Sequence, residues 1–468
     1  MRLITMLAAL VTLQLIAQDP LRIWGLTPFG GANNKGTVFV VDADGTNFTT
    51  VYDFSDASGH TPEGGLVLAP NNMIYGLTTF GGEGAPAAGT LFMIDPSNNT
   101  FTKLHDFAIS DGGFNWSTPI VGTDGLLYFA GYGGSGGGGG IFRLDPATNE
   151  YTELYGLTQA TDGGAITGRL LQAADGMFYG TASQGGANNE AGTIFRYNAV
   201  TDVFEKLHDF DGAAGGRTPY GGLCQADNGV FYGTTHEGGL NNRGTVYKYN
   251  AVTDVFTKIY DTAEDDGGNT WASIKRLGPD LLIGGVATGS LNSSGFLYTV
   301  VPSTDAVTMV TNFSLVTGAN PVGDLVSGPD GQLYGLLSQG GSGFFGTLCR
   351  FDALTFQPTV LHNFTNGADG GLPRGEPLVI IAAVGVEEIA ARPFFSVGPN
   401  PSGGEVTLRC DARMLPAQAR ITDALGRTMR VMNIVNSSTT IDLGDAPGMH
   451  SITLTSMTRA QTVRVAVH

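Results

Sequence analysis

The sequence is short of charged residues and of cysteine. Of its 468 residues only 14% are charged, and 42 acidic against 24 basic side chains give a formal net charge of −18. An acidic surface argues against binding of phosphate-rich polymers, so nucleic acid is not expected among the partners. The three cysteines form no Cys-x-x-Cys pair and are odd in number, which argues against a disulfide framework or a zinc knuckle. We expect Cys224, Cys349 and Cys410 to be buried or incidental thiols.

Long apolar segments are lacking after the first residues of the chain. Leu3–Ala17 is apolar, but at 15 residues it is short for a membrane span, and it follows the basic Met1-Arg2. The small Ala17 before Gln18 suits cleavage by signal peptidase. We predict a secretory signal peptide at residues 1–17, with an uncleaved anchor as the alternative. No transmembrane span is expected in the mature chain.

A sustained helical period is absent from the repeat region, whereas glycine is abundant. The 71 glycines are roughly double the average usage, and the 42% of hydrophobic residues is not typical of a disordered chain. The glycines punctuate a pattern in which one strand residue recurs every 51 to 53 positions. The recurring residues are Trp24, Tyr75, Tyr128, Tyr179, Tyr232, Tyr334 and, in the weakest copy, Ile283. Seven tandem repeats of about 52 residues are therefore predicted.

Each repeat holds four short strand-like runs separated by turn residues. In one clear copy they are Leu66–Ala69, Met73–Thr78, Thr90–Ile94 and Phe101–Phe107. Four short antiparallel strands are typical of one blade of a propeller. The fold class is therefore predicted to be all-β, with residues 18–384 forming a seven-bladed β-propeller.

The two ends of the repeat array complement each other. The array starts at a second strand, Leu21–Leu26, and ends with a first strand, Pro377–Ile381, that has no second strand after it. Pairing of the two would complete the first blade and close the ring, which leaves no unpaired sheet edge at the join. Four-stranded blades would then place the Gly-Gly loops and the Asp-Gly-Gly segments on one face, which is the expected binding face.

The repeat resembles the glycine-rich GloVer repeat of exported bacterial proteins. The pattern is specific in the copy with Tyr179-Gly180, Gly185-Gly186, Gly192-Thr-Ile-Phe195 and Leu207-His-Asp-Phe210. The resemblance covers roughly residues 21–382, and the sixth copy departs from it at Ile283. It implies a propeller-like fold and no established enzymatic activity.

A different composition follows the repeats. Residues 385–393 are predicted to be a linker, and residues 394–468 a small C-terminal β-sandwich. Its motifs are Pro399-Asn400-Pro401, the turn from Asp423 to Gly426 and the strand that begins at Gly448. They resemble the type A sorting domain of the type IX secretion system, although Met449-His450 stands where that family usually has an aromatic residue.

This second resemblance implies that the type IX secretion machinery is a partner. It also implies that the protein is secreted or held on the outer cell surface of a Gram-negative bacterium. A small accessory sandwich, such as an adhesion module, is the alternative. We expect the protein to be a monomer.

The candidate ligand-binding residues lie in loops of the expected binding face. Trp116 and Trp271 follow Asp-Gly-Gly segments at equivalent spacing. Exposed tryptophans there would stack on sugar rings, and the alternative is that they pack beneath the loops. His60 and His236 are candidates on the same face, but they have no partner at metal-ligand spacing, so no metal is expected.

Catalytic motifs are missing. No nucleophile elbow or phosphate-binding loop is present, and Asp42–Gly45 sits where other repeats have a hairpin turn. His105, His208 and His362 share a repeat position with tyrosines, which is typical of packing. No catalytic residue and no cofactor is expected.

The leading hypothesis is a non-catalytic propeller that binds a glycan, a peptide or a protein. One alternative is a secreted propeller enzyme that acts on polysaccharide as a lyase or glycosidase. The other is a purely structural component of the cell surface.

Overall fold

The computed structural model describes residues 21–381, apart from residues 84–85, 189, 213, 228, 263–267, 269 and 289–293. In the C-terminal part it describes residues 395–398, 405–410, 417–422, 428–443, 448–455 and 460–467. The chain divides into two compact units, Met1–Val384 and Gly385–His468, and each is described by itself. The predicted signal peptide, residues 1–17, lies outside the described residues.

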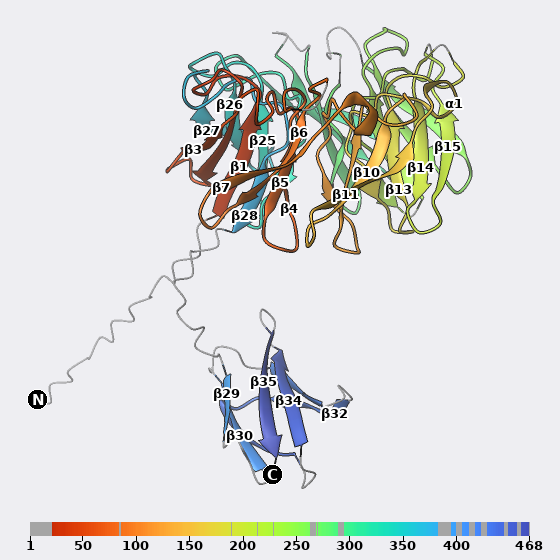
Figure 1. The fold of residues 1–468 in the computed structure, drawn as a ribbon. Coiled ribbons are helices and arrows are strands. Elements are labelled where there is room, and N and C mark those ends of the chain that lie inside the picture. The colour runs from red at the N-terminus through yellow and green to blue at the C-terminus, as the bar shows by residue number, and fades with distance from the viewer. Residues whose placement is uncertain are drawn as a thin grey trace, which may run out of the picture. The chain divides into compact units, whose positions relative to one another are not determined.

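The first unit is built from antiparallel sheets of four short strands, seven of them in the described residues (Figure 1). One sheet has the order β28-β1-β2-β3 and consists of Leu378–Ile381, Leu21–Thr27, Thr37–Asp42 and Thr49–Asp53. The next three are β4 to β7 (Val67–Leu68, Ile74–Leu77, Thr90–Asp95, Thr100–Asp106), β8 to β11 (Ile120–Val121, Leu127–Gly131, Gly140–Asp145, Glu150–Gly156) and β12 to β15 (Leu171–Gln172, Phe178–Ala182, Thr193–Asn198, Val203–Asp209). The last three are β16 to β19 (Cys224–Asp227, Val230–Thr235, Thr245–Asn250, Val255–Asp261), β20 to β23 (Lys275–Gly278, Leu281–Val286, Phe296–Val301, Ala306–Asn312) and β24 to β27 (Val326–Ser327, Leu333–Leu337, Thr347–Phe351, Pro358–Asn363).

The pairing predicted between the two ends of the array is present. β28 pairs with β1 in antiparallel register, with Trp24 opposite Leu378 and Leu21 opposite Ile381. The side chains of β28 other than Ile381 are half-buried. The last strand of the array therefore completes the sheet that holds its first strand.

Apolar side chains fill the space between neighbouring sheets. Seven buried clusters occur in the described part of this unit, and each is shared by two sheets. Six of them join consecutive sheets in chain order, and the seventh joins the last sheet to the first, where Leu348 and Phe364 pack with Phe39 and Val41. Every sheet is thus covered on both faces by apolar contacts.

The glycine that follows the recurring aromatic residue has a steric cause. Gly76 lies opposite Phe92 in the register of β5 and β6, and a Cβ on Gly76 would run into the ring of Phe92. The paired glycines Gly81 and Gly82 have φ angles of 79° and 91°, a left-handed backbone that other residues rarely adopt. The sequence pattern is therefore a packing and turn requirement of the sheet.

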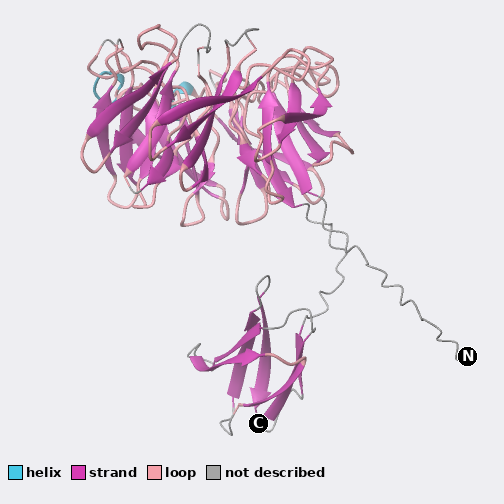
Figure 2. Cartoon of the chain, turned by 180° about the vertical axis from the view of Figure 1, so that it is seen from behind, coloured by secondary structure: helices cyan, strands magenta, loops and turns pink. Residues whose placement is uncertain are grey.

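Loops connect the strands at both ends of the sheets (Figure 1). Among the described residues the only helical turns are Ile109–Asp111 (η1) and Gln159–Asp162 (α1), which follow β7 and β11 (Figure 2). They belong to connections that lead from the fourth strand of one sheet to the first strand of the next. No helix in the described part of the chain is long and apolar enough to cross a membrane.

The second unit holds two antiparallel sheets in its described residues. One has the order β29-β30-β33 (Phe395–Gly398, Glu405–Cys410, Ser438–Asp442), and the other β32-β31-β34-β35 (Thr428–Ile434, Ala417–Thr422, Gly448–Thr455, Ala460–Val467). Val406 and Leu408 of the first sheet share a buried cluster with Ile421 and Leu454 of the second. The two sheets therefore have a common apolar core.

Strand β32 is not predicted from the sequence, because the exposed Met429 and Val431 obscure the alternation of polar and apolar residues. Of the sorting-domain motifs, Gly448 begins β34. The remaining motif residues, Pro399, Asn400, Pro401, Asp423 and Gly426, lie outside the described residues.

Removal of β28 should destabilise the first unit. Deletion of Pro377–Ile381 would leave β1 with an unpaired edge and expose apolar side chains of the first sheet. Full burial of one large aliphatic side chain contributes about 1.5–3 kcal/mol, so loss of these half-buried side chains should lower the unfolding free energy by about 3–5 kcal/mol. Urea unfolding measures the change, and deletion of residues 386–390, in the predicted linker, is the control of equal length. Equal stability of the two variants would contradict the closing role of β28.

Candidate functional site

One pocket is lined by an equivalent loop residue from each of the seven repeats of the first unit. In each repeat this residue lies four positions before the first strand, and the seven positions are 51 to 53 residues apart. We name them the mouth ring: Glu63, Trp116, Thr167, Tyr220, Trp271, Val322 and Arg374. The cavity volume of the pocket is about 70 Å³, well below the roughly 300–1,000 Å³ of sites that enclose a whole small ligand, so the pocket has room for only part of a ligand.

Two positions further along each repeat, a second set of residues lines the same pocket. This second ring consists of Thr118, Arg169, Ser273, Asp324 and Glu376, with Gly65 and Gly222 at the other two positions. Hydrogen bonds between sheets hold it in place. The N–H of Gly65 donates to Thr118 Oγ1 at 2.8 Å, and the N–H of Gly222 donates to Ser273 Oγ at 2.9 Å.

The residues between the two rings are small in every repeat. They are Gly64, Ser117, Gly168, Gly221, Ala272, Gly323 and Gly375. A Cβ on Gly168 would touch the backbone of Gly222, and one on Gly323 would touch that of Gly375. The close approach of neighbouring sheets therefore requires a small residue at this position. In both rings, by contrast, the residue type differs from repeat to repeat. Positions that the fold leaves free, gathered round one pocket, are suited to recognise a ligand.

Aromatic side chains form one part of the mouth ring. The rings of Tyr220 and Trp271 stack with centroids 4.3 Å apart and planes 8° apart. His236 packs edge-on to both rings, with its centroid 4.9 Å from each. Trp271 remains 45% exposed. A large aromatic surface therefore borders the pocket and is open to solvent.

Glu63 forms a second group in the mouth ring, with Trp116 and Arg374. Trp116 is half-buried, packs against Tyr132 at 5.7 Å and lowers the pKa of the nearby Glu63 carboxyl. Arg374 donates to the same carboxylate at 2.8 Å. Burial nevertheless raises the pKa of Glu63, because Arg374 and Trp116 offset only part of the desolvation of the carboxylate.

The charged residues of the second ring form one network. Arg169 donates to both carboxylate oxygens of Glu376, at 3.1 and 3.2 Å, and lies 3.8 Å from the carboxylate of Asp324. Burial raises the pKa of Glu376, and Glu376 in turn raises the pKa of Arg169. Lys275, the first residue of β20, lies beside this network, and burial lowers its pKa.

The pocket is thus balanced in charge and lined by aromatic rings. Its lining holds two basic groups, Arg169 and Arg374, and three acidic groups, Glu63, Asp324 and Glu376, and Lys275 beside the network supplies a third basic group. Among the described residues no group of three or more His, Cys, Asp or Glu side chains is placed to hold a metal ion. The arrangement suits binding of a polar, uncharged group against an aromatic face.

Three of the four ligand-binding residues predicted from the sequence meet at this pocket. Trp116 and Trp271 line it, and His236 contacts the stacked pair. His60 lies elsewhere, with its Nε2 3.5 Å from Asp56 and its ring 5.9 Å from that of Phe80. The residues that sequence reasoning did not single out are Glu63, Arg169, Tyr220, Asp324, Arg374 and Glu376. Alignment of the repeats on their first strands would have found them.

The histidines at the shared repeat position pack between sheets, as predicted. His208 stacks on Phe256 with centroids 4.3 Å apart and planes 4° apart. His362 stacks on Phe48 at 3.9 Å and 9°. Burial lowers the pKa of both histidines, which keeps the rings neutral near neutral pH.

The cysteines and the Asp42–Gly45 segment have structural roles. All three cysteines are buried and none of them forms a disulfide, and burial raises the pKa of the Cys224 thiol to about 11. Asp44 accepts a hydrogen bond from the hydroxyl of Thr46, and Asp42 accepts one from the amide of Asn47. The Asp42–Gly45 segment is therefore a hairpin turn between β2 and β3, as predicted.

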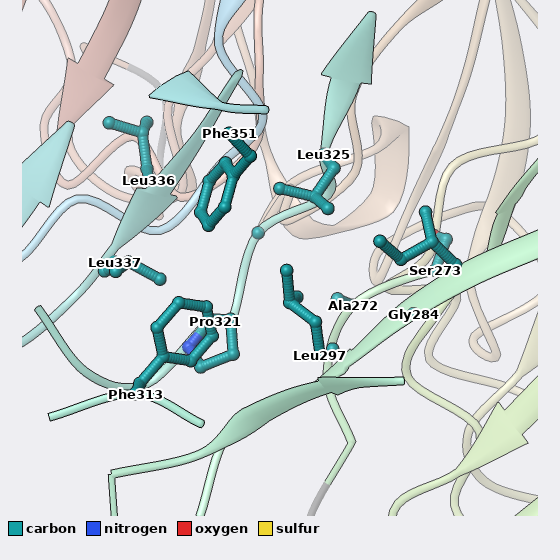
Figure 3. A pocket seen from close by; sticks show the side chains of 13 residues that line it. Ala272, Ser273, Gly284, Leu297, Phe313, Pro321, Leu325, Leu336, Leu337 and Phe351 are labelled. Atoms are coloured by element: carbon teal, nitrogen blue, oxygen red, sulfur yellow. The ribbon is translucent and has the colours of Figure 1, made fainter. Parts of the chain in front are cut away.

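An apolar pocket lies between the sheets β20–β23 and β24–β27 (Figure 3). Leu297 and Phe313 approach it from one sheet, and Leu325, Leu337 and Phe351 from the other. All five belong to the buried cluster that the two sheets share. We therefore assign this space to core packing.

Glu376 should make folding less favourable as pH rises. Its pKa is raised above 4.5 in the folded protein, so its contribution to stability is full below pH 4.5 and is lost as pH rises through the folded-state pKa. Relative to the wild type, Glu376→Gln should gain stability over this range, by about 1.4 kcal/mol for each unit by which the pKa is raised. Urea unfolding from pH 4 to pH 8 measures the difference, with the exposed Glu150→Gln as control. A difference that falls with pH would contradict the burial of an ionised Glu376.

Several solved structures are similar to this chain. PorZ, an essential surface component of the type IX secretion system of Porphyromonas gingivalis, is 15% identical with a TM-score of 0.43. The match covers 92% of this chain and 63% of PorZ, so the chain spans less than two thirds of that protein's length. A putative 6-phosphogluconolactonase from Bacteroides fragilis is 14% identical with a TM-score of 0.52, over 78% of this chain and 98% of its own. The β-propeller domain of the Trilobed protease from Pyrococcus furiosus is 10% identical with a TM-score of 0.42, over 71% of this chain and 88% of its own.

Identities this low show the fold alone. None of the curated proteins is significantly similar to this chain in sequence. The repeats, however, match the Gloeobacter/Verrucomicrobia repeat at residues 12–190 and 166–383, which together cover most of the chain. The chain therefore belongs to the Gloeobacter/Verrucomicrobia repeat family.

Proposed function

We propose that the first unit is a closed, seven-bladed β-propeller that acts as a non-catalytic binding scaffold, with its ligand held at the mouth ring. Support for a closed ring comes from the seven interfaces that join the sheets in a cycle. Further support comes from one pocket that collects a residue from each sheet. The single observation that carries the binding role is the exposed Trp271, stacked on Tyr220 at that pocket.

Export is the second part of the proposal. Residues 1–17 would act as a signal peptide, residues 385–393 as a linker and residues 394–468 as a β-sandwich sorting domain recognised by the type IX secretion machinery. The protein would be secreted or displayed on the outer surface of a Gram-negative cell as a monomer. Support comes from the sequence motifs of both ends and from the common core of the two C-terminal sheets.

An enzyme that acts on polysaccharide is the second candidate, and one observation favours it. Three carboxylates line the pocket, and the raised pKa of Glu63 and Glu376 is what a proton donor would need. We favour binding because arginines already hold these carboxylates: Arg374 holds Glu63, and Arg169 holds Glu376. A general base would require a carboxylate that is free to accept a proton.

Substitution of Trp271 should weaken binding. Purified residues 18–385 applied to glycan and polysaccharide arrays should give binding that Trp271→Ala reduces about tenfold, since loss of one aromatic contact costs about 1.4 kcal/mol. Leu354→Ala, at a residue that is 89% exposed elsewhere, is the control. Absence of both binding and turnover would overturn both carbohydrate hypotheses. Release of reducing ends that disappears in Glu63→Gln would favour the enzyme.

Removal of residues 394–468 should block export. In the native host, cell fractionation should find the truncated protein retained inside the outer membrane and the full chain outside it. Deletion of residues 386–390 is the control and should leave export unchanged. Equal export of the truncated protein would show that residues 394–468 form an accessory module instead.

A further inference from the structure

Aromatic side chains continue from the mouth ring across the neighbouring loops. Each ring of this set contacts the next, and we name the set the aromatic row: His60, Phe80, Phe114, Tyr132 and Trp116. The centroid distances along the row are 5.9, 5.6, 6.4 and 5.7 Å. One end of the row is therefore a residue of the pocket.

The row follows successive loops at one end of the sheets. Its members come from the connections after β3, β5, β7 and β9, which alternate between fourth-strand exits and second-to-third-strand loops. Phe80 and Tyr132 remain 37% and 38% exposed. A run of partly exposed aromatic rings is unusual on a monomeric protein and marks an interaction surface.

The fold does not require these aromatic residues. The backbone bridge between His60 and Phe80 recurs in other repeats, where it joins Gly164 with Gln184 and Ala319 with Gln339. Small and polar residues therefore serve equally well at both positions. The rings of His60 and Phe80 are therefore not a requirement of the repeat.

Charges along the row are matched, as they are in the pocket. Asp56 lies 2.7 Å from Lys35 and 3.5 Å from His60. Glu63 is paired with Arg374 at the point where the row enters the pocket. An anionic ligand would face Asp56, Glu63 and a net charge of −18, and a cationic ligand would have to displace the bound arginines and lysine.

We propose that the aromatic row and the pocket together bind one neutral polysaccharide chain. A sugar at the mouth ring would stack on Trp271, and further sugars would follow the row from Trp116 towards His60. The C–H faces of pyranose rings are apolar and pack on aromatic rings, while their hydroxyls bond to paired polar groups without taking up charge. This inference rests on the proposed function, since it names the ligand class of the same pocket.

Chain length is the test that separates the row from the pocket. Calorimetric titration of residues 18–385 with neutral gluco-, xylo- and manno-oligosaccharides, from disaccharide to hexasaccharide, should give affinity that rises with length in one series. Tyr132→Ala and Phe80→Ala should each weaken hexasaccharide binding about threefold to tenfold and leave disaccharide binding unchanged. Tyr132→Phe, which keeps the ring, should bind as the wild type does.

Phe344→Ala is the matched control, because Phe344 is 68% exposed in a second-to-third-strand loop outside the row. Hexasaccharide binding no stronger than disaccharide binding, with Trp271→Ala still impaired, would overturn the row and leave the pocket intact. Stronger binding of polygalacturonate than of any neutral chain would overturn the charge argument. No binding to any oligosaccharide would overturn this inference, and capture of a protein ligand that Trp271→Ala abolishes would show that the binding scaffold itself stands.

Discussion

Face-to-face packing of neighbouring sheets is the constraint on which the first unit depends. A sheet of four short strands with apolar residues on both faces must be covered on both, so the last sheet of the array has to meet the first. β28 meets this requirement by joining the sheet of β1. Arg374 and Glu376 lie four and two residues before β28, so the strand that closes the array also brings one residue to each ring of the pocket. The pairing of β28 with β1 therefore both joins the ends of the array and completes the lining of the pocket.

The repeat separates positions that serve the fold from positions that serve the site. Between the two rings every repeat has a small residue, because the backbones of adjacent sheets approach closely there. The residues on either side of this small residue line the pocket in most repeats, and types as different as Trp271, Val322 and Arg374 occur there. Variation at these positions costs the fold little, which is why a repeat scaffold can build a ligand-specific surface without altering its core.

The sequence reveals strands and closure better than it reveals the site. Spacing alone predicts the strands of each repeat and the partner of Leu21–Leu26, because both follow from local patterns of apolar residues and turns. It also predicts Trp116 and Trp271, since large aromatic residues stand out in loops. The sequence does not predict the pair of Arg169 and Glu376, because the two residues are 207 positions apart and meet only in the folded arrangement of the sheets. The sequence does not predict strand β32 either, because its apolar residues face both solvent and the core, which obscures the alternating pattern.

Burial of the charged residues of the pocket lowers the stability of the fold unless their interactions offset the loss of hydration. Burial of ionised groups is unfavourable unless each is paired, and ion pairs of this kind seldom add net stability over apolar side chains. Here both carboxylate oxygens of Glu376 accept hydrogen bonds from Arg169, and Glu63 accepts one from Arg374. Carboxylates engaged in this way hold the two arginines in place. What they leave accessible is the 44% exposed side chain of Arg374 and the 45% exposed ring of Trp271. Fixed hydrogen-bond donors beside an aromatic face are the features that hold a polar, uncharged ring, as the proposed ligand requires.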